Sequence, residues 1–132
     1  MEACGKVQTT DVFDDWFAGL DEGAQVEVIA KVELLKRLGP MLSRPHADTL
    51  KGSKHANMKE LRANTRDQVL RVAFAFDRAR SAILLIGGDK SGVGQKRFYK
   101  GLISRADLLY DRHLERASQG TNGKESSHGE IV

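Results

Sequence analysis

The segment VLRVAFAFDRARSAILLI, residues 69–86, predicts two neighbouring strands joined by a tight turn. Large apolar side chains alternate along residues 69–76 with smaller ones and a single guanidinium, that of Arg71, a pattern typical of a strand with two unlike faces. Residues 77–81 are polar, and the continuous apolar run 82–86 is typical of the buried centre of a sheet. The segment therefore predicts a hairpin with one large apolar face and Arg71 on the other.

Shorter signals lie on either side of this hairpin. MKELR, residues 58–62, predicts one more strand before it, and residues 6–9 predict a short strand near the start of the chain. Residues 42–57 show no periodicity and contain Pro45 and Gly52, so they predict a basic loop. The Gly-rich residues 87–94 predict a flexible loop that ends the last strand.

Helical patterns occupy both ends of the chain. Apolar residues at i, i+3, i+4 and i+7 predict a helix that begins near Thr10 and Asp11: Phe13, Trp16, Phe17 and Leu20. Asp21 is a candidate N-cap for a second helix ended by Gly39–Pro40, and the two helices predict an antiparallel hairpin. A last helix is predicted from Phe98 to about Ser118.

The fold class predicted is α+β, a small mainly antiparallel sheet packed against an N-terminal helical hairpin and a C-terminal helix. With 132 residues, 40% of them apolar, the chain has material for one modest core. We expect one domain over residues 1–117 and a disordered polar tail over 118–132. Cys4, the single cysteine, excludes an internal disulfide. The N-terminus lacks the pattern of a secretory signal and no apolar run is long enough to span a bilayer, so a cytoplasmic location without membrane contact is expected.

Charge is concentrated in the middle of the chain. Residues 41–105 hold 14 Lys and Arg against 5 Asp and Glu, a net charge of +9, whereas both flanking segments are net acidic. Such polarisation favours a polyanionic partner, because each neutralised phosphate releases counterions. We therefore expect RNA binding.

Pairing of residues 58–62 with 69–77 would bring Arg62 and Arg71 together on one sheet face. The neighbouring loops would add cations from two directions: Lys51, Lys54 and His55, and Lys90, Lys96 and Arg97. A groove of this kind suits metal-independent RNA cleavage, in which a 2′-hydroxyl attacks the adjacent phosphate and arginines stabilise the dianionic phosphorane. The four histidines have no metal-ligand spacing, so neither a metal nor another cofactor is expected.

The order strand, two helices, three strands, helix, together with KELR, LRVAFAFD and GGDKSGVGQKRFY, resembles the RelE/HigB superfamily of toxin-antitoxin toxins, in particular its phage-derived HigB-like branch. The resemblance spans Val7 to Leu114. It implies a RelE-like fold and a toxin that acts as an mRNA endonuclease (an mRNA interferase) at the ribosome and thereby inhibits translation. It also implies a cognate antitoxin protein as partner.

The same resemblance implies roles for individual residues. Arg62 matches the arginine that closes the second-strand motif of the family, Arg71 the arginine that contacts the scissile phosphate, and Lys90 a phosphate-binding residue in the loop after the last strand. Tyr99 matches an aromatic residue that stacks on a base near the cut. Further RNA contacts are expected from Lys51, Lys59, Lys96 and Arg97. RelE-like members carry paired lysines where this chain has Lys59 followed by Glu60.

The general base is left open among Lys54, His55 and Glu60. Glu60 suits either a base or a structural partner of Arg62, and His55 has an ordinary pKa near neutrality. Two other functions fit the same pattern. One is a gyrase-inhibiting toxin of the ParE type, against which the basic loop GDKSGVGQKR argues, and the other is a catalytically inactive RNA-binding or interaction module.

Overall fold

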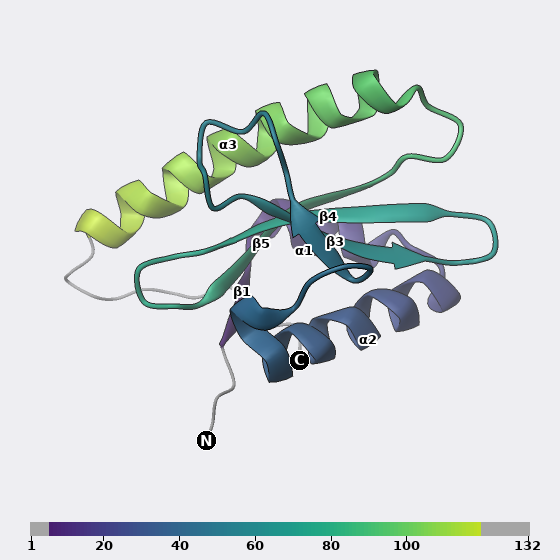
Figure 1. Ribbon diagram of the computed structural model, residues 1–132, viewed down its shortest axis with the longest axis horizontal. Helices are drawn as coiled ribbons and strands as arrows, with labels where there is room; N and C mark the ends of the chain where they lie inside the picture. The colour runs from purple at the N-terminus through teal and green to yellow at the C-terminus, as the bar shows by residue number, and fades with distance from the viewer. Residues whose placement is uncertain (1–5, 120–132) are drawn as a thin grey trace.

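A computed structural model describes residues 6–119 (Figure 1). Its elements in chain order are β1 (Val7–Thr9), α1 (Asp11–Ala18), α2 (Glu22–Leu38), the short 3-10 helix η1 (Gly39–Met41), β2 (Ala47–Thr49), β3 (Lys59–Asn64), β4 (Val69–Phe76), β5 (Ala82–Asp89) and α3 (Gln95–Gln119).

The strands form one five-stranded sheet in the order β1-β5-β4-β3-β2. β1 runs parallel to β5, and the other three pairings are antiparallel. Helices α2 and α3 lie on opposite sides of this sheet (Figure 1). The mixed, mainly antiparallel sheet and the C-terminal helix confirm the α+β class.

Both N-terminal helices begin where the sequence predicted: α1 starts at Thr10 and Asp11, and Asp21, the predicted N-cap, precedes α2. The Thr10 hydroxyl accepts a hydrogen bond from the Phe13 amide (2.9 Å) and donates to the Leu85 carbonyl (2.7 Å), which ties the start of α1 to β5. The Asp21 carboxylate accepts from the Ala24 amide at the start of α2 (2.8 Å). These caps satisfy amides that a helix end leaves unpaired. α1 then packs over β5, and α2 packs over β3.

The two faces of the sheet bury separate cores. On the α2 face, the large residues of β4 join Phe13 of α1 and the inner residues of α2. On the α3 face, Ala73 and Ala75 lie under the apolar side of α3, which includes Leu102 and Tyr110. The alternation predicted for β4 is therefore confirmed, and α3 covers the part of the small-residue face around Ala73 and Ala75.

The prediction of a loop throughout residues 42–57 is wrong at β2. Ala47–Thr49 pairs antiparallel with β3, with Asp48 opposite Glu60. Three residues are too few to show a period of two, so this strand depends on its neighbour β3 and carries no pattern of its own.

The predicted loop is also wrong at residues 87–89, which belong to β5. Gly87 is buried, and a Cβ there would lie 2.4–2.5 Å from ring atoms of Trp16. The glycine therefore lets the indole of α1 approach the strand backbone, so it does not mark a flexible segment.

Helix α3 begins three residues before the predicted Phe98, because its first turn, from Gln95, is polar and gives no apolar signal. The helix runs two residues past the expected domain end at 117, to Gln119. Cys4 and residues 120–132 of the expected tail lie outside the described residues. Within residues 6–119, no helix combines the length and apolarity needed to cross a bilayer.

We predict that Gly87→Ala destabilises the chain by about 2 kcal/mol, because the methyl group would overlap the Trp16 ring. Urea unfolding followed by circular dichroism measures the change. The matched control is Gly23→Ala in α2, where the new Cβ meets only Asp21 at 3.6 Å and stability should hold or rise. Equal losses in both variants would contradict the packing argument.

Candidate active site

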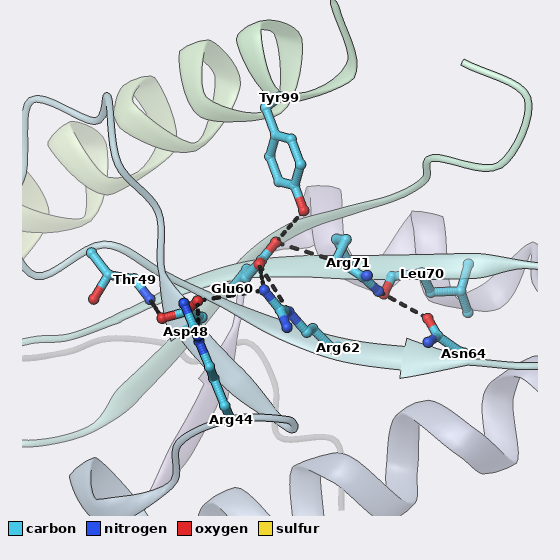
Figure 2. Close-up of polar contacts among 9 residues, drawn as sticks. All are labelled: Arg44, Asp48, Thr49, Glu60, Arg62, Asn64, Leu70, Arg71 and Tyr99. Carbon is cyan, nitrogen blue, oxygen red and sulfur yellow. Dashed lines mark hydrogen bonds and ion pairs between the residues drawn. The ribbon is translucent and has the colours of Figure 1, made fainter. Parts of the chain in front are cut away.

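Two arginines face each other on the α3 side of the sheet. Arg62 of β3 and Arg71 of β4 are direct partners in the antiparallel register, as the sequence predicted. Like charges in such a pair repel, so their placement requires a compensating anion. Figure 2 shows that anion, the carboxylate of Glu60, lying between the arginines.

Glu60 is 3% exposed, and both of its oxygens are engaged. Oε2 accepts hydrogen bonds from Nε (3.0 Å) and Nη2 (2.9 Å) of Arg62. Oε1 accepts from the Tyr99 hydroxyl (2.6 Å) and forms an ion pair with Nε of Arg71 (3.6 Å). One buried carboxylate thus orients two guanidinium groups and a phenol that come from β3, β4 and α3.

Arg71 is the more deeply buried arginine, with 8% of its side chain exposed against 30% for Arg62. Its Nη1 donates to the Asn64 side chain and the Leu70 carbonyl, both at 2.9 Å, whereas its Nε is buried without a hydrogen-bond partner. Burial of a cation is costly unless it is paired, so Glu60 and Asn64 hold Arg71 in one orientation.

Asp48 of β2 extends the chain of charges outward. Its carboxylate accepts from Nε of Arg44 (2.9 Å) and lies 3.5 Å from Nη2 of Arg62 (Figure 2). The backbone amide of Thr49 and the nearby Arg44 lower the pKa of Asp48 below its ordinary value. Asp48 was not among the predicted site residues, because β2 itself was not predicted.

Lys90 and Tyr99 complete the site. The Lys90 ammonium lies 5.3 Å from the centroid of the Tyr99 ring. Burial, Arg71 and Arg62 together lower the pKa of Lys90, and the opposing effect of Glu60 is smaller than the sum of these three. Burial and the hydrogen bond to Glu60 raise the pKa of Tyr99, so its phenol stays a neutral donor. We call Glu60, Arg62, Arg71, Lys90 and Tyr99 the arginine-pair cluster.

Asp89 holds the backbone from which Lys90 projects. Its Oδ1 accepts from the amides of Val69 and Ser91, both at 3.0 Å, and from the Ser91 hydroxyl (2.6 Å). Burial acts to raise the pKa of Asp89, but these hydrogen bonds outweigh it and the pKa is lowered. The end of β5 and the following turn are thereby fixed next to the cluster.

Two of the predicted site residues lie elsewhere. Lys54 and His55 both pair with Asp111 of α3, at 2.7 and 2.8 Å. Asp111 follows Tyr99 by 12 residues of helix, which corresponds to about 18 Å along the axis. The structure therefore does not bring Lys54 or His55 to the arginine pair, although both were predicted to line the same groove.

The predicted RNA-binding lysines and arginine are distributed around the molecule. Lys51 is exposed in the same loop as Lys54. Strand alternation places Lys59 on the sheet face opposite Glu60. Lys96 and Arg97 are exposed in the first turn of α3, which also carries Tyr99. Only this last pair borders the cluster.

The arginine-pair cluster combines three cations, Arg62, Arg71 and Lys90, with the single carboxylate of Glu60. Guanidinium and ammonium groups supply directed hydrogen-bond donors. Among residues 6–119, no three His, Cys, Asp or Glu side chains lie close enough together to hold a metal ion. The fold and the site together define a small α+β domain with a preorganised arginine pair on one sheet face.

Comparisons with known proteins identify the family of this chain. Residues 15–111 match the family described as phage derived protein Gp49-like (DUF891), and the chain belongs to this family. It is also similar to two proteins of Mycobacterium tuberculosis (strain ATCC 25618 / H37Rv). "Putative toxin HigB2" is 42% identical over 100 residues, and "Putative toxin HigB3" is 47% identical over 100 residues. Each match covers 75% of this chain, but it spans only 49% of HigB2 and 84% of HigB3.

We predict that Glu60→Gln destabilises the chain by about 2–3 kcal/mol, because a neutral amide leaves the two arginines uncompensated. Chemical denaturation measures the loss. Glu33→Gln is the control, since the Glu33 side chain is 53% exposed and lies 3.9 Å from Lys36, so its loss should stay within about 0.5 kcal/mol. A neutral effect at Glu60 would show that the arginines do not depend on the carboxylate.

We predict that Lys90→Met stabilises the chain near neutral pH, because it removes a cation from beside Arg71 and Arg62. The pKa of Lys90 is lower in the folded chain than its ordinary value of 10.5, which applies to the unfolded chain. Between these two pKa values the unfolded chain binds more protons, so the stability of the wild type increases as the pH rises through this range. The advantage of the variant should therefore shrink from pH 7 to pH 10.

Urea unfolding at several pH values, taken as the difference between variant and wild type, isolates this effect from other titrating groups. Lys100→Met, at an exposed position of α3, serves as control and should leave the difference flat. A Lys90→Met chain that is less stable at pH 7 would refute repulsion by the arginines.

Proposed function

We propose that the chain is the toxin of a toxin-antitoxin module and that it acts as a metal-independent endoribonuclease on mRNA, at the ribosome. The observation that carries the proposal is the Arg62–Arg71 pair, fixed across β3 and β4 by the buried Glu60. The toxin names of the two mycobacterial relatives, which are 42% and 47% identical to this chain over 100 residues, support the first part.

The proposed reaction needs no group from outside the chain and the RNA. The 2′-oxygen of one ribose attacks the adjacent phosphorus, and the bond from phosphorus to the 5′-oxygen of the next nucleotide breaks. The products are a 2′,3′-cyclic phosphate and a 5′-hydroxyl. One proton leaves the 2′-hydroxyl and one reaches the departing 5′-oxygen, so atoms and charge balance.

The arginine pair supplies the largest part of the catalysis in this scheme. Charge builds up on the non-bridging phosphate oxygens as the phosphorane forms, and preorganised guanidinium donors stabilise it without reorganising. Arg71 is held by its neighbours in one orientation, and Arg62 is the more accessible of the two. Guanidinium groups fixed in this way stabilise the transition state better than a mobile lysine cluster of equal charge would.

Two groups of the cluster have the chemistry to move protons. The lowered pKa of Lys90 brings its proton exchange closer to neutral pH, and the Tyr99 phenol stays protonated as a donor. Glu60 is occupied by three partners, which favours the role of a structural partner over that of a base. Lys54 and His55 are bound to Asp111 and take no part in this scheme.

RNA is the substrate that the charge and the reaction require. DNA lacks the 2′-hydroxyl nucleophile, and the net charge of +9 over residues 41–105 matches a phosphate backbone. An antitoxin protein, mRNA and the ribosome are the proposed partners. An uncontrolled translation inhibitor would harm the cell that makes it, so we expect an antitoxin to cover the site. We expect the antitoxin to present acidic residues to the arginine-pair cluster, because they complement its positive charge.

We predict that Arg71→Ala and Arg71→Lys lower the cleavage rate about 10²–10³-fold, the usual cost of losing a directed transition-state donor. The assay is translation of a reporter message in vitro with primer extension across the cut, with and without EDTA. Wild-type cleavage should persist in EDTA and leave 5′-hydroxyl ends.

The control is Arg37→Ala, which removes an exposed arginine from α2, on the other side of the sheet. Thermal unfolding of each variant separates loss of catalysis from loss of fold, and Arg71→Lys keeps a cation against Glu60. Induced expression of each variant in a bacterial host measures growth arrest, and arrest that survives Arg71→Ala would refute the nuclease. Arrest without message cleavage would favour gyrase inhibition, and RNA binding without arrest an inactive module.

A further inference from the structure

A recess opens beside the arginine-pair cluster, between the end of β5 and the first half of α3. Its volume is about 210 Å³. It is lined by Ile86, Gly87, Gly88, Phe98, Gly101, Leu102 and Arg105. We call it the Gly101 recess. It is smaller than the pockets that hold drug-sized molecules, and its mixture of aromatic, aliphatic and cationic walls suits a single planar ring.

The recess is directly connected to the arginine pair through the sheet. Gly88 is the register partner of Arg71, so the two residues are neighbours on the same face. A Cβ at Gly88 would lie 3.0 Å from the Phe98 ring, which shows how closely that ring covers the strand. Phe98 also contacts Tyr99 edge to face, with centroids 5.2 Å apart. One aromatic ring therefore stands between the cluster and the recess.

Gly101 is the unexpected residue of this wall. It lies inside α3, where glycine is a poor helix former, and it is exposed. Nothing lies within 4 Å of the position that its Cβ would take, so packing within the described residues does not require glycine. Because Gly101 lines the recess, we expect a long side chain at this position to take up space at its edge.

Charge selects among possible occupants. Arg105 lines the recess, is exposed and forms no ion pair within residues 6–119, and Arg97 lies two turns earlier on the same helix. A planar group with hydrogen-bond acceptors, attached to an anionic backbone, fits an aromatic wall beside a guanidinium. An apolar side chain of a protein would leave Arg105 unused.

We propose that the Gly101 recess binds one nucleobase of the RNA whose phosphate lies at Arg62 and Arg71, with Phe98 as the stacking surface and Arg105 as the donor. This inference rests on the proposed function, because it takes the ligand to be RNA. It assigns base recognition to Phe98, whereas Tyr99 is engaged by Glu60 and Lys90. Gly101 keeps the recess open at the expense of helix stability.

The test measures RNA binding without cleavage. A fluorescent ten-nucleotide strand, 2′-O-methylated throughout, lacks the nucleophile, and a set of strands each carries one abasic site. Fluorescence anisotropy compares wild type with Gly101→Ala, Gly101→Leu and the control Ser104→Ala, an exposed substitution one turn along α3 and outside the recess lining. Thermal unfolding of each chain accompanies the binding curves.

We expect one abasic position to weaken wild-type binding roughly tenfold, the usual effect of losing one stacked base. Gly101→Leu should lose the same factor with the intact strand and become insensitive to that abasic site, because the base no longer enters. Gly101→Ala should fall between the two while its Tm rises by about 2–4 °C. Ser104→Ala should bind like wild type.

Three outcomes overturn the inference. The first is binding of the intact strand by Gly101→Leu that equals that of wild type. The second is an equal loss of affinity by Gly101→Leu for intact and abasic strands, and the third is wild-type binding that does not depend on any abasic site. If wild type binds no strand at low salt, the inference fails, whereas the proposed nuclease stands as long as the chain cuts message at the ribosome. If wild type binds with the expected base dependence but does not cut unmodified message, the nuclease fails and the base site stands.

Discussion

The buried carboxylate of Glu60 is the contact on which the polar half of this protein depends. Without it, Arg62 and Arg71 would face each other as like charges across neighbouring strands. With it, β3, β4 and α3 share one hydrogen-bonded centre, and Arg62 carries the connection on to Asp48 of β2. A buried ion pair adds little stability by itself, but it specifies where each partner must lie. The position of the Glu60 carboxylate therefore determines both how β3, β4 and α3 meet and how the two arginines are oriented.

The α3 face of the sheet is divided between two tasks. Around Ala73 and Ala75, small residues let α3 lie close and bury an apolar core. Toward Arg71 and Gly88, the same face becomes polar, and α3 contributes Phe98 and Tyr99 as side walls. A long helix that is anchored in the core at one part and forms the site at another holds the site rigid, which a loop would not do. The far part of α3 receives a second anchor, from Lys54 and His55 to Asp111.

The sequence predicted local features well and long-range partners poorly. Alternation along residues 69–76, the helix start near Thr10 and the N-cap Asp21 are local patterns, and each was confirmed, as was the Arg62–Arg71 pairing that follows from adjacent strands. The destination of Lys54 and His55 depends on Asp111, more than 50 residues away, and no local pattern reports it. Gly87 was assigned to a loop for the same reason, since its partner is Trp16.

Two carboxylates, those of Glu60 and Asp48, lie at a site proposed to bind an anion. Asp48 and Glu60 orient Arg62 and Arg71, but the cluster still holds three cations, Arg62, Arg71 and Lys90, against the one carboxylate of Glu60. Burial and Arg71 lower the pKa of Lys90 despite the opposing effect of Glu60. Arg71 also keeps a buried Nε without a hydrogen-bond partner. The carboxylates therefore fix the direction of the positive charge without cancelling it. An incoming phosphate would offset the repulsion between Lys90 and the arginines, which supports the proposal that the cluster binds a negatively charged ligand.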